Sequence, residues 1–117
     1  MQTFPIKIYI AGPYTSAPKR NVKRAIDVAN IFLDVGLQPY IPHLTHYWHK
    51  RYPNLWQRWL ELDEAFLGVC DALYRFEGPS AGADREVAFA KKKGIPCYHK
   101  THIAIYELTG LVQCETG

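Results

Sequence analysis

The chain alternates short apolar runs with longer segments of helical periodicity. The segment IKIYIAG (6–12) is a continuous run of mostly β-branched, aromatic and other apolar residues, which predicts a buried strand. Three further apolar runs bounded by Gly, Pro or Asp predict strands at LQPYIP (37–42), DALYRFEG (71–78) and IPCYH (95–99). The pattern therefore indicates four strands spread along the whole chain.

Between these runs, apolar residues recur at the spacing of amphipathic helices. Helices are predicted over 18–35, from Pro53 to about Gly68, over 81–94 after a Ser80 cap, and over 103–110. The polar and aromatic segment between the second strand and Pro53 is predicted to be a long loop, of the kind that is often functional. The expected apolar faces of the first two helices are Val22, Ala25, Ile26, Ala29, Phe32 and Leu33, and Trp56, Trp59, Leu60, Phe66 and Leu67.

Strands and helices in alternation predict an α/β fold. We expect a flavodoxin- or Rossmann-like three-layer sandwich with a small, four- to five-stranded, mainly parallel sheet, in a single domain over residues 1–117. Ligands of such sheets bind outside the carboxyl ends of the strands. The loops at those ends are AGPYTSAP, PHLTHYWH and EGPSAGAD. They supply our candidate substrate-binding residues, which are Gly12, Tyr14, Thr15, Ser16, His43, His46, Ser80 and Gly82.

Two carboxylates interrupt apolar helix faces. Glu86 shares a face with Ala83 and Ala90, and Asp63 follows Trp59 by one turn. Burying an unpaired charge is costly, so each carboxylate needs partners or a chemical role. Local hydrogen bonding would satisfy either one, but two on neighbouring helices favour a shared site. We expect Glu86, near its helix start, to be ionised, and Asp63, among apolar side chains, to be neutral.

Composition narrows the functional classes. The net charge of +3 comes from spread-out basic residues, which argues against a nucleic-acid footprint. No apolar stretch approaches the length of a membrane span, and the first residues lack a signal-peptide layout. Cys70, Cys97 and Cys114 form no CxxC pair and are typical of reduced thiols. We therefore expect a cytoplasmic protein without nucleic-acid or membrane partners.

The five histidines raise the question of a metal. His43, His46 and His49 recur at a spacing of three, but no acidic ligand accompanies them, so we expect no metal and no cofactor. The alternative is a metal-dependent hydrolase that uses these three histidines. Activity that is insensitive to a chelator would exclude it. The chain also contains neither a GxGxxG sequence nor a P-loop, so no motif supports a dinucleotide or triphosphate ligand.

Several segments together resemble the nucleoside 2-deoxyribosyltransferase superfamily. The resemblance rests on IYIAGPYT, on LDEAFLGVCDALYRFEGPSAGADREVAFAKKKGIPCY and on their order, and it covers nearly the whole chain. That superfamily includes small nucleotide N-glycosidases, namely 2′-deoxynucleoside 5′-monophosphate N-hydrolase and CMP N-glycosidase. The chain is most similar to small members that carry PHLTHYWH, for which no activity is implied.

The resemblance implies roles for individual residues. Tyr9 would orient the catalytic Glu86, which begins an E-x-x-x-A segment. Asp63, eight residues before Asp71, would be the proton donor or the acid that contacts the base. Ser80 stands where transferases of unphosphorylated nucleosides have an acid and monophosphate hydrolases have serine, which favours a 5′-monophosphate. An N-cap role would explain the same serine.

One departure from the superfamily concerns the phosphate. The first loop lacks an arginine that the deoxynucleotide hydrolase carries, and Lys19 and Arg20 are the candidate substitutes. Tyr14, Tyr47 and Trp48 are candidates to stack on a planar base. The resemblance also implies a homodimer or a higher symmetric homo-oligomer in which a neighbouring subunit completes the site.

The sequence thus predicts an enzyme that cleaves the N-glycosidic bond of a nucleoside 5′-monophosphate through a glutamate nucleophile. Two other functions stay open. One is a nucleoside 2-deoxyribosyltransferase acting on free nucleosides. The other is a non-catalytic protein that binds a nucleotide or an ADP-ribose-like ligand. A structural or interaction module, in which Asp63 and Glu86 only brace loops, is a further alternative.

Overall fold

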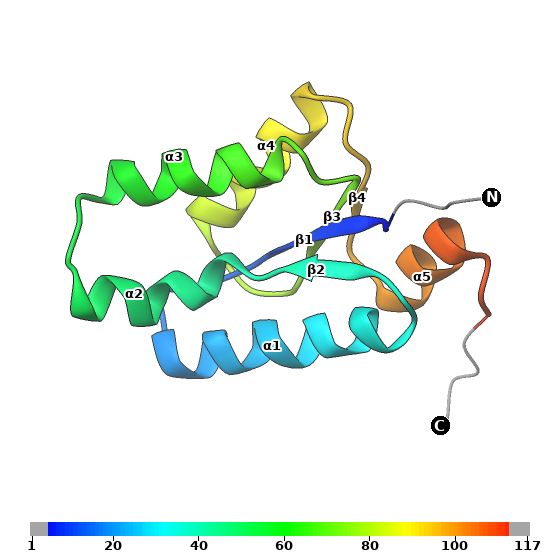
Figure 1. The fold of residues 1–117 in the computed structure, drawn as a ribbon, viewed down its shortest axis with the longest axis horizontal. Helices are drawn as coiled ribbons and strands as arrows, with labels where there is room; N and C mark the ends of the chain where they lie inside the picture. The colour runs from blue at the N-terminus through cyan, green and yellow to red at the C-terminus, as the bar shows by residue number, and fades with distance from the viewer. Residues whose placement is uncertain (1–4, 113–117) are drawn as a thin grey trace.

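A computed structural model describes residues 5–112 of the chain, and it has the predicted α/β fold (Figure 1). Four parallel strands form one sheet in the order β2-β1-β3-β4. The elements in chain order are β1 (Lys7–Ala11), α1 (Pro18–Asp34), β2 (Gln38–Tyr40), the 3-10 turn η1 (Pro42–Leu44), α2 (Thr45–Arg51), α3 (Trp56–Leu67), β3 (Ala72–Arg75), α4 (Ala81–Lys92), β4 (Cys97–Tyr98) and α5 (Thr101–Thr109).

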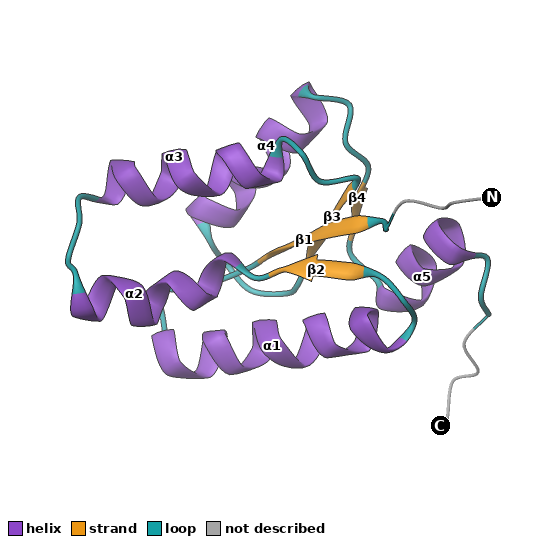
Figure 2. Cartoon of the chain, in the orientation of Figure 1, coloured by secondary structure: helices purple, strands orange, loops and turns teal. Residues whose placement is uncertain are grey.

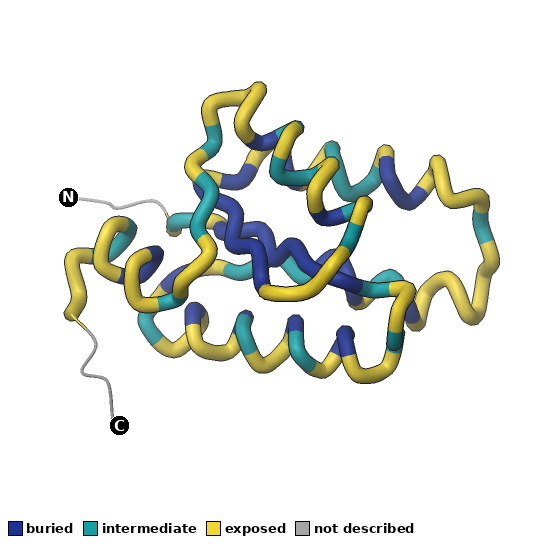
Figure 3. Tube along the Cα trace, turned by 180° about the vertical axis from the view of Figure 1, so that it is seen from behind, coloured by how far each residue is buried: buried dark blue, intermediate teal, exposed yellow. Residues whose placement is uncertain are grey.

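The central strand β1 supplies both faces of the core by simple alternation. Ile8 and Ile10 pack against α1 and α5, whereas Tyr9 and Ala11 pack against α3 and α4. Figure 1 shows the same layers, with α3 and α4 above the sheet and α1 and α5 below it. Figure 3 shows the buried strands between the more exposed helices. The three-layer arrangement predicted from the sequence is therefore confirmed, and it places Tyr9 under the helices that carry Asp63 and Glu86.

The segment after β2 is more ordered than the sequence indicated. Instead of a long loop, it forms η1 and the seven-residue helix α2 (Figure 2). A helix of two turns is too short to show a clear apolar period. The following helix also begins later than predicted, because the chain stays extended after Pro53 and α3 starts at Trp56.

Some predicted core residues lie on the surface. Four apolar side chains assigned to helix faces are 41–57% exposed, namely Ile26, Leu33, Trp56 and Phe66. The sheet is short, so it covers a narrower stripe of each helix than the apolar pattern suggests. Cys70 and Cys97 are free thiols, while Cys114 and the tail after it lie outside the described residues. Across residues 5–112, none of the helices combines the length and the apolar character that a membrane crossing needs.

Two glycines bring the turns after β1 and β3 into contact. A methyl group on Gly12 would lie 2.2 Å from ring carbons of Phe76, so only a bare backbone fits there. Gly78 has φ +124°, and a methyl group on it would lie 2.7 Å from Pro13. Close packing of the two turns therefore accounts for both glycines.

We expect Gly12→Ala to destabilise the fold by about 1–3 kcal/mol, because the added methyl group overpacks the Phe76 ring. Urea denaturation monitored by circular dichroism measures this loss. Gly82→Ala is the matched control, since its methyl group would meet nothing closer than 3.9 Å. Equal stabilities of the two variants would contradict this packing account of Gly12.

Candidate functional site

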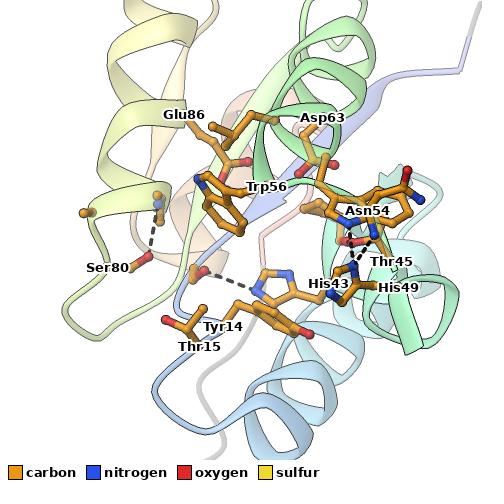
Figure 4. A pocket seen from close by; sticks show the side chains of 17 residues that line it. Tyr14, Thr15, His43, Thr45, His49, Asn54, Trp56, Asp63, Ser80 and Glu86 are labelled. Carbon is orange, nitrogen blue, oxygen red and sulfur yellow. Dashed lines mark hydrogen bonds between the residues drawn. The ribbon is translucent and has the colours of Figure 1, made fainter. Parts of the chain in front are cut away.

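A pocket of about 630 Å³ opens between the carboxyl ends of the central strands and helices α3 and α4 (Figure 4). Eight of the predicted site residues line it, namely Gly12, Tyr14, Thr15, His43, Asp63, Ser80, Gly82 and Glu86. Its other lining residues are Pro42, Thr45, His49, Asn54, Trp56, Trp59, Leu60, Ala81 and Ala83. Of the remaining candidates, Tyr9 is buried on β1, Ser16 lies in the first loop without lining the pocket, and His46 lies on α2, where it contacts Tyr14.

Glu86 projects into this pocket from the second turn of α4. Burial raises the pKa of its carboxyl to about 8, and the nearby Asp63 charge adds to the increase. The Tyr9 hydroxyl and the Arg75 guanidinium act in the opposite direction. Its Oε2 atom is buried without a hydrogen-bond partner. A buried polar atom of this kind calls for an explanation, and a bound ligand is one.

Asp63 reaches the same pocket from α3. Burial raises the pKa of its carboxyl to about 7, with a smaller contribution from Glu64, and Oδ1 is buried without a partner. The two helices are tied together by an ion pair of 3.1 Å between Arg85 and Glu64, the residues next to Glu86 and Asp63 in the sequence. This pair links the two helices that present the carboxyl groups.

Tyr9 lies on the floor beneath both carboxyl groups. It is fully buried on β1, and the pKa of its phenol is raised well above the ordinary value by burial, then by the charges of Glu86 and Asp63. Its hydroxyl has no hydrogen bond of good geometry, yet it is close enough to lower the pKa of Glu86. The phenol can therefore donate to an ionised Glu86 after a small movement, as the resemblance implied.

The expected ionisation of Glu86 is wrong for the ligand-free protein. We expected the start of the helix to favour the charged form, but Glu86 is the sixth residue of α4. The field of a helix terminus fades within the first turn, whereas the desolvation of a buried carboxyl persists wherever it lies. Both carboxyl groups therefore titrate near neutral pH.

These pKa values make stability depend on pH. The pKa of Glu86 is about 8 in the folded state against an ordinary 4.5, so the wild type loses stability as pH rises from about 4.5 through 8. We expect Glu86→Gln to abolish much of that loss and to be more stable than the wild type by about 1–4 kcal/mol at pH 8.5. The gain should vanish near pH 4.5.

Thermal unfolding across pH measures this difference. The exposed Glu61→Gln change on α3 is the control for removing a carboxylate. A wild-type stability that rises between pH 5 and 8 relative to Glu86→Gln would contradict the raised pKa.

The other end of the pocket is the start of α4. The Ser80 hydroxyl caps the helix by accepting a hydrogen bond of 3.1 Å from the Ala83 N–H, as predicted. Ala81 and Gly82 line the pocket, and their N–H groups precede the helical bonding pattern at the start of α4. Together with the Ser80 O–H, which remains available to donate, they form a small cradle suited to an anion.

Arg75 holds this cradle in place. It is 9% exposed on β3 and donates to the carbonyls of Phe76 and Gly78, with an ion pair of 3.2 Å to Asp84 in the first turn of α4. These contacts fasten the turn that leads to Ser80. Arg75 is thus a positioning residue for the start of α4.

Side chains of α1 and α2 hold the first loop in place through hydrogen bonds. The Asn21 side chain donates to the Tyr14 carbonyl and to Ser16 Oγ at 3.2 and 3.1 Å, and the Tyr14 hydroxyl lies 2.6 Å from His46 Nδ1. Ser16 and His46 therefore support Tyr14 and do not line the pocket. Lys19 and Arg20, the candidate substitutes for the missing arginine, are exposed and do not line it either.

The three histidines of the η1–α2 segment do not act as one group. His43 lies within hydrogen-bonding distance of the Gly12 and Pro13 carbonyls, and His49 accepts from Trp59. His46 instead meets Tyr14. Within residues 5–112, no group of three His, Cys, Asp or Glu side chains is placed to hold a metal ion.

Sequence reasoning assigned no site role to several lining residues. Trp56 and Trp59 precede the predicted Asp63 by seven and four residues on α3, so helical spacing was a usable signal for both tryptophans. Tyr47 and Trp48, the proposed base-stacking residues, are exposed and lie off this pocket. For His49 and Asn54 no sequence signal exists, because His49 lies on the short helix α2, which shows no clear apolar period, and Asn54 lies in the connection between α2 and α3.

The fold and the site define an α/β protein with a carboxylate-lined pocket at the carboxyl edge of a parallel sheet. The chain belongs to the family described as Domain of unknown function (DUF7768), whose model matches residues 6–100. No curated protein matches the chain significantly.

Two solved structures share the fold. One is a 2-deoxyribosyltransferase from the psychrotolerant bacterium Bacillus psychrosaccharolyticus, with 19% identity, a TM-score of 0.55, and coverage of 78% of this chain and 69% of that one. The other is a conserved protein from Enterococcus faecalis V583, with 23% identity, a TM-score of 0.58, and coverage of 80% of this chain and 62% of that one. At these identities the likeness concerns the fold, and the chain spans about two thirds of the length of each structure.

Proposed function

We propose that this protein cleaves the N-glycosidic bond of a nucleoside 5′-monophosphate. The observation that carries the proposal is the pair of carboxyl groups, Glu86 and Asp63, that line one pocket, each with a buried and unpartnered oxygen atom, beside the buried Tyr9. Paired carboxyl groups flanking a glycosidic bond, with an oxocarbenium-like transition state, are the general solution for this chemistry. The fold shared with a 2-deoxyribosyltransferase supports the same class of reaction.

In the proposed mechanism Glu86 attacks C1′ of the sugar, or stabilises the positive charge that develops there. That charge favours the ionised form of Glu86, while Asp63 holds the one proton that the pair retains. Asp63 then donates this proton to the departing base, and Tyr9 holds Glu86 by a hydrogen bond. Water then attacks C1′ and gives its proton to the ionised Asp63 while the bond between Glu86 and C1′ breaks, which completes hydrolysis.

The phosphate would occupy the cradle at the start of α4. Glu86 lies six residues beyond Ser80 along the helix, a rise of about 9 Å. That distance is on the scale of a sugar 5-phosphate whose C1′ lies at Glu86. Ser80 would donate its hydroxyl proton to a phosphate oxygen beside the N–H groups of Ala81 and Gly82.

One observation favours the second candidate, a transferase of free nucleosides. The lining residues of the pocket include no Lys or Arg, and a dianionic phosphate is usually bound with at least one of them. A non-catalytic nucleotide-binding protein is the third candidate, because the raised pKa of Glu86 keeps it largely protonated at pH 7 in the absence of ligand.

One experiment separates these candidates. The purified protein is incubated with nucleosides and 5′-monophosphates, in ribo and deoxy forms, and free base is followed by chromatography. Base released only from monophosphates supports the proposal. Release from free nucleosides, or exchange with an added base, supports the transferase. Binding without release identifies a binding protein, and a panel that neither binds nor reacts excludes all three.

A further inference from the structure

His43 presents a fixed hydrogen-bond acceptor to the pocket. Its Nε2 atom lies 3.2 Å from the Gly12 carbonyl and 3.0 Å from the Pro13 carbonyl. A carbonyl oxygen can only accept, so Nε2 must carry the ring proton. Burial lowers the pKa of this imidazole, so the ring is neutral at pH 7. Its Nδ1 atom is therefore a lone-pair acceptor, and it is buried without a partner in a side chain that is 5% exposed and lines the pocket.

His49 has the same tautomer but presents the opposite atom. Its Nδ1 accepts from the Trp59 indole N–H at 2.8 Å and from the Asn54 backbone N–H at 3.2 Å. Both partners can only donate, so Nδ1 carries no proton and Nε2 carries one. With Nδ1 held against α3, the Nε2–H edge is the donor that remains for a ligand in the pocket that His49 lines.

The two rings lie away from the anion cradle. In Figure 4, Ser80 and His49 lie at opposite sides of the pocket, with Glu86 and Asp63 along the edge between them and His43 facing that edge. A phosphate at the start of α4 and a sugar C1′ at Glu86 leave the part of the pocket near Asp63, Trp59 and the two rings for the leaving group. The leaving group of an N-glycosidic bond is a flat heterocycle.

We propose that His43 and His49 together recognise the polar edge of the nucleobase. His43 accepts a hydrogen bond from the base through Nδ1, and His49 donates one to the base through Nε2–H. This inference rests on the proposed function and specifies its substrate as a base that carries an N–H donor beside an acceptor. A heterocycle without an N–H donor leaves His43 Nδ1 buried and unpaired, which costs binding free energy.

Substituting a histidine by glutamine or asparagine can delete the function of one ring nitrogen and keep that of the other. Glutamine in place of His43 keeps an N–H group near the position of Nε2 and lacks Nδ1. Asparagine in place of His49 keeps an acceptor near the position of Nδ1 and lacks Nε2–H. His43→Gln and His49→Asn thus delete the atoms that face the pocket, whereas His43→Asn and His49→Gln delete the atoms that hold the fold.

The test uses the full chain with Glu86→Gln, which prevents turnover, and measures dissociation constants by titration calorimetry. The probes are ribose 5-phosphate and the nucleoside 5′-monophosphate that binds best among the common ribo and deoxy forms. We expect His43→Gln and His49→Asn to weaken nucleotide binding by about 5- to 20-fold each and to leave the affinity for ribose 5-phosphate unchanged. The exposed His102→Gln change is the control.

The outcomes separate this inference from the proposed function. If both substitutions leave nucleotide binding intact, the inference about the two histidines is overturned and the proposed function stands. An equal loss of affinity for the nucleotide and for ribose 5-phosphate has the same meaning. If the wild-type chain binds no nucleotide, the proposed function falls and the inference with it.

A second measurement needs no variant of the histidines. Nitrogen-15 spectra of the Glu86→Gln chain should show Nδ1 of both rings unprotonated. The His43 Nδ1 signal should shift on adding nucleotide and remain in place on adding ribose 5-phosphate. A protonated His43 Nδ1 in the ligand-free chain would overturn the proposal.

Discussion

Glu86→Gln is expected to lower the rate of base release by on the order of 10³-fold or more, because the substitution removes the only group placed to attack or stabilise C1′ in the proposed mechanism. Glutamine has the shape of glutamate but cannot carry a negative charge. The loss should appear in kcat more than in KM, since the charge matters most in the transition state. Single-turnover chromatography of the released base measures it.

The interpretation of this loss depends on an intact fold. The raised pKa of Glu86 shows that its charge opposes folding at neutral and alkaline pH, so the variant should be inactive and yet at least as stable as the wild type at pH 8.5. Such a combination is typical of a residue retained for chemistry. A variant that still releases base at the wild-type rate would exclude Glu86 as the nucleophile, whatever its stability.

The sheet and its order along the chain could be predicted because each strand is a distinct apolar run. The run around Tyr9 is long enough to be recognised as a buried central strand, and the helices between the runs leave only parallel crossovers. The seven residues of α2 could not be predicted in the same way. Helices this short are stabilised by their contacts with the rest of the fold and carry little signal of their own.

The two carboxyl groups could be found from the sequence because a charged residue that interrupts the apolar face of a helix is visible in the pattern of residues. Their protonation could not, since it depends on how deeply each group is buried and on the charges around it. The carboxyl group of Glu86 is withdrawn from water and close enough to Asp63 to feel its charge, and neither fact follows from its place in α4. The expected ionised nucleophile is therefore a property of the complex with substrate in our proposal, where the sugar brings positive charge.

The sequence could not predict which ring nitrogen of His43 or His49 is free to bind a ligand. His43 and His49 carry the same tautomer, yet backbone carbonyls fix one ring and the N–H groups of Asn54 and Trp59 fix the other. Which nitrogen remains for a ligand depends on contacts between segments 30 residues apart, such as Pro13 and His43. The sequence indicated only that polar side chains gather at this edge of the sheet.

Asp63→Asn is expected to slow the release of natural bases by about 10²- to 10⁴-fold, the range for loss of a general acid. A purine or pyrimidine departs as a poor leaving group unless it is protonated. A sugar 5-phosphate with a 4-nitrophenyl leaving group needs no proton, so its hydrolysis by the variant should remain close to the wild-type rate. The ratio of the two rates, measured for both proteins, isolates the role of the proton from effects on folding or binding.

The Asp27→Asn change on the exposed face of α1 is the control for this comparison. Burial holds the pKa of Asp63 at about 7, so Asp63 is an effective acid only below that pH in the free enzyme. The advantage of the wild type over Asp63→Asn in kcat/KM for natural bases should therefore diminish as pH rises above 7. Equal slowing of both leaving groups, at every pH, would instead show that Asp63 positions the substrate and transfers no proton.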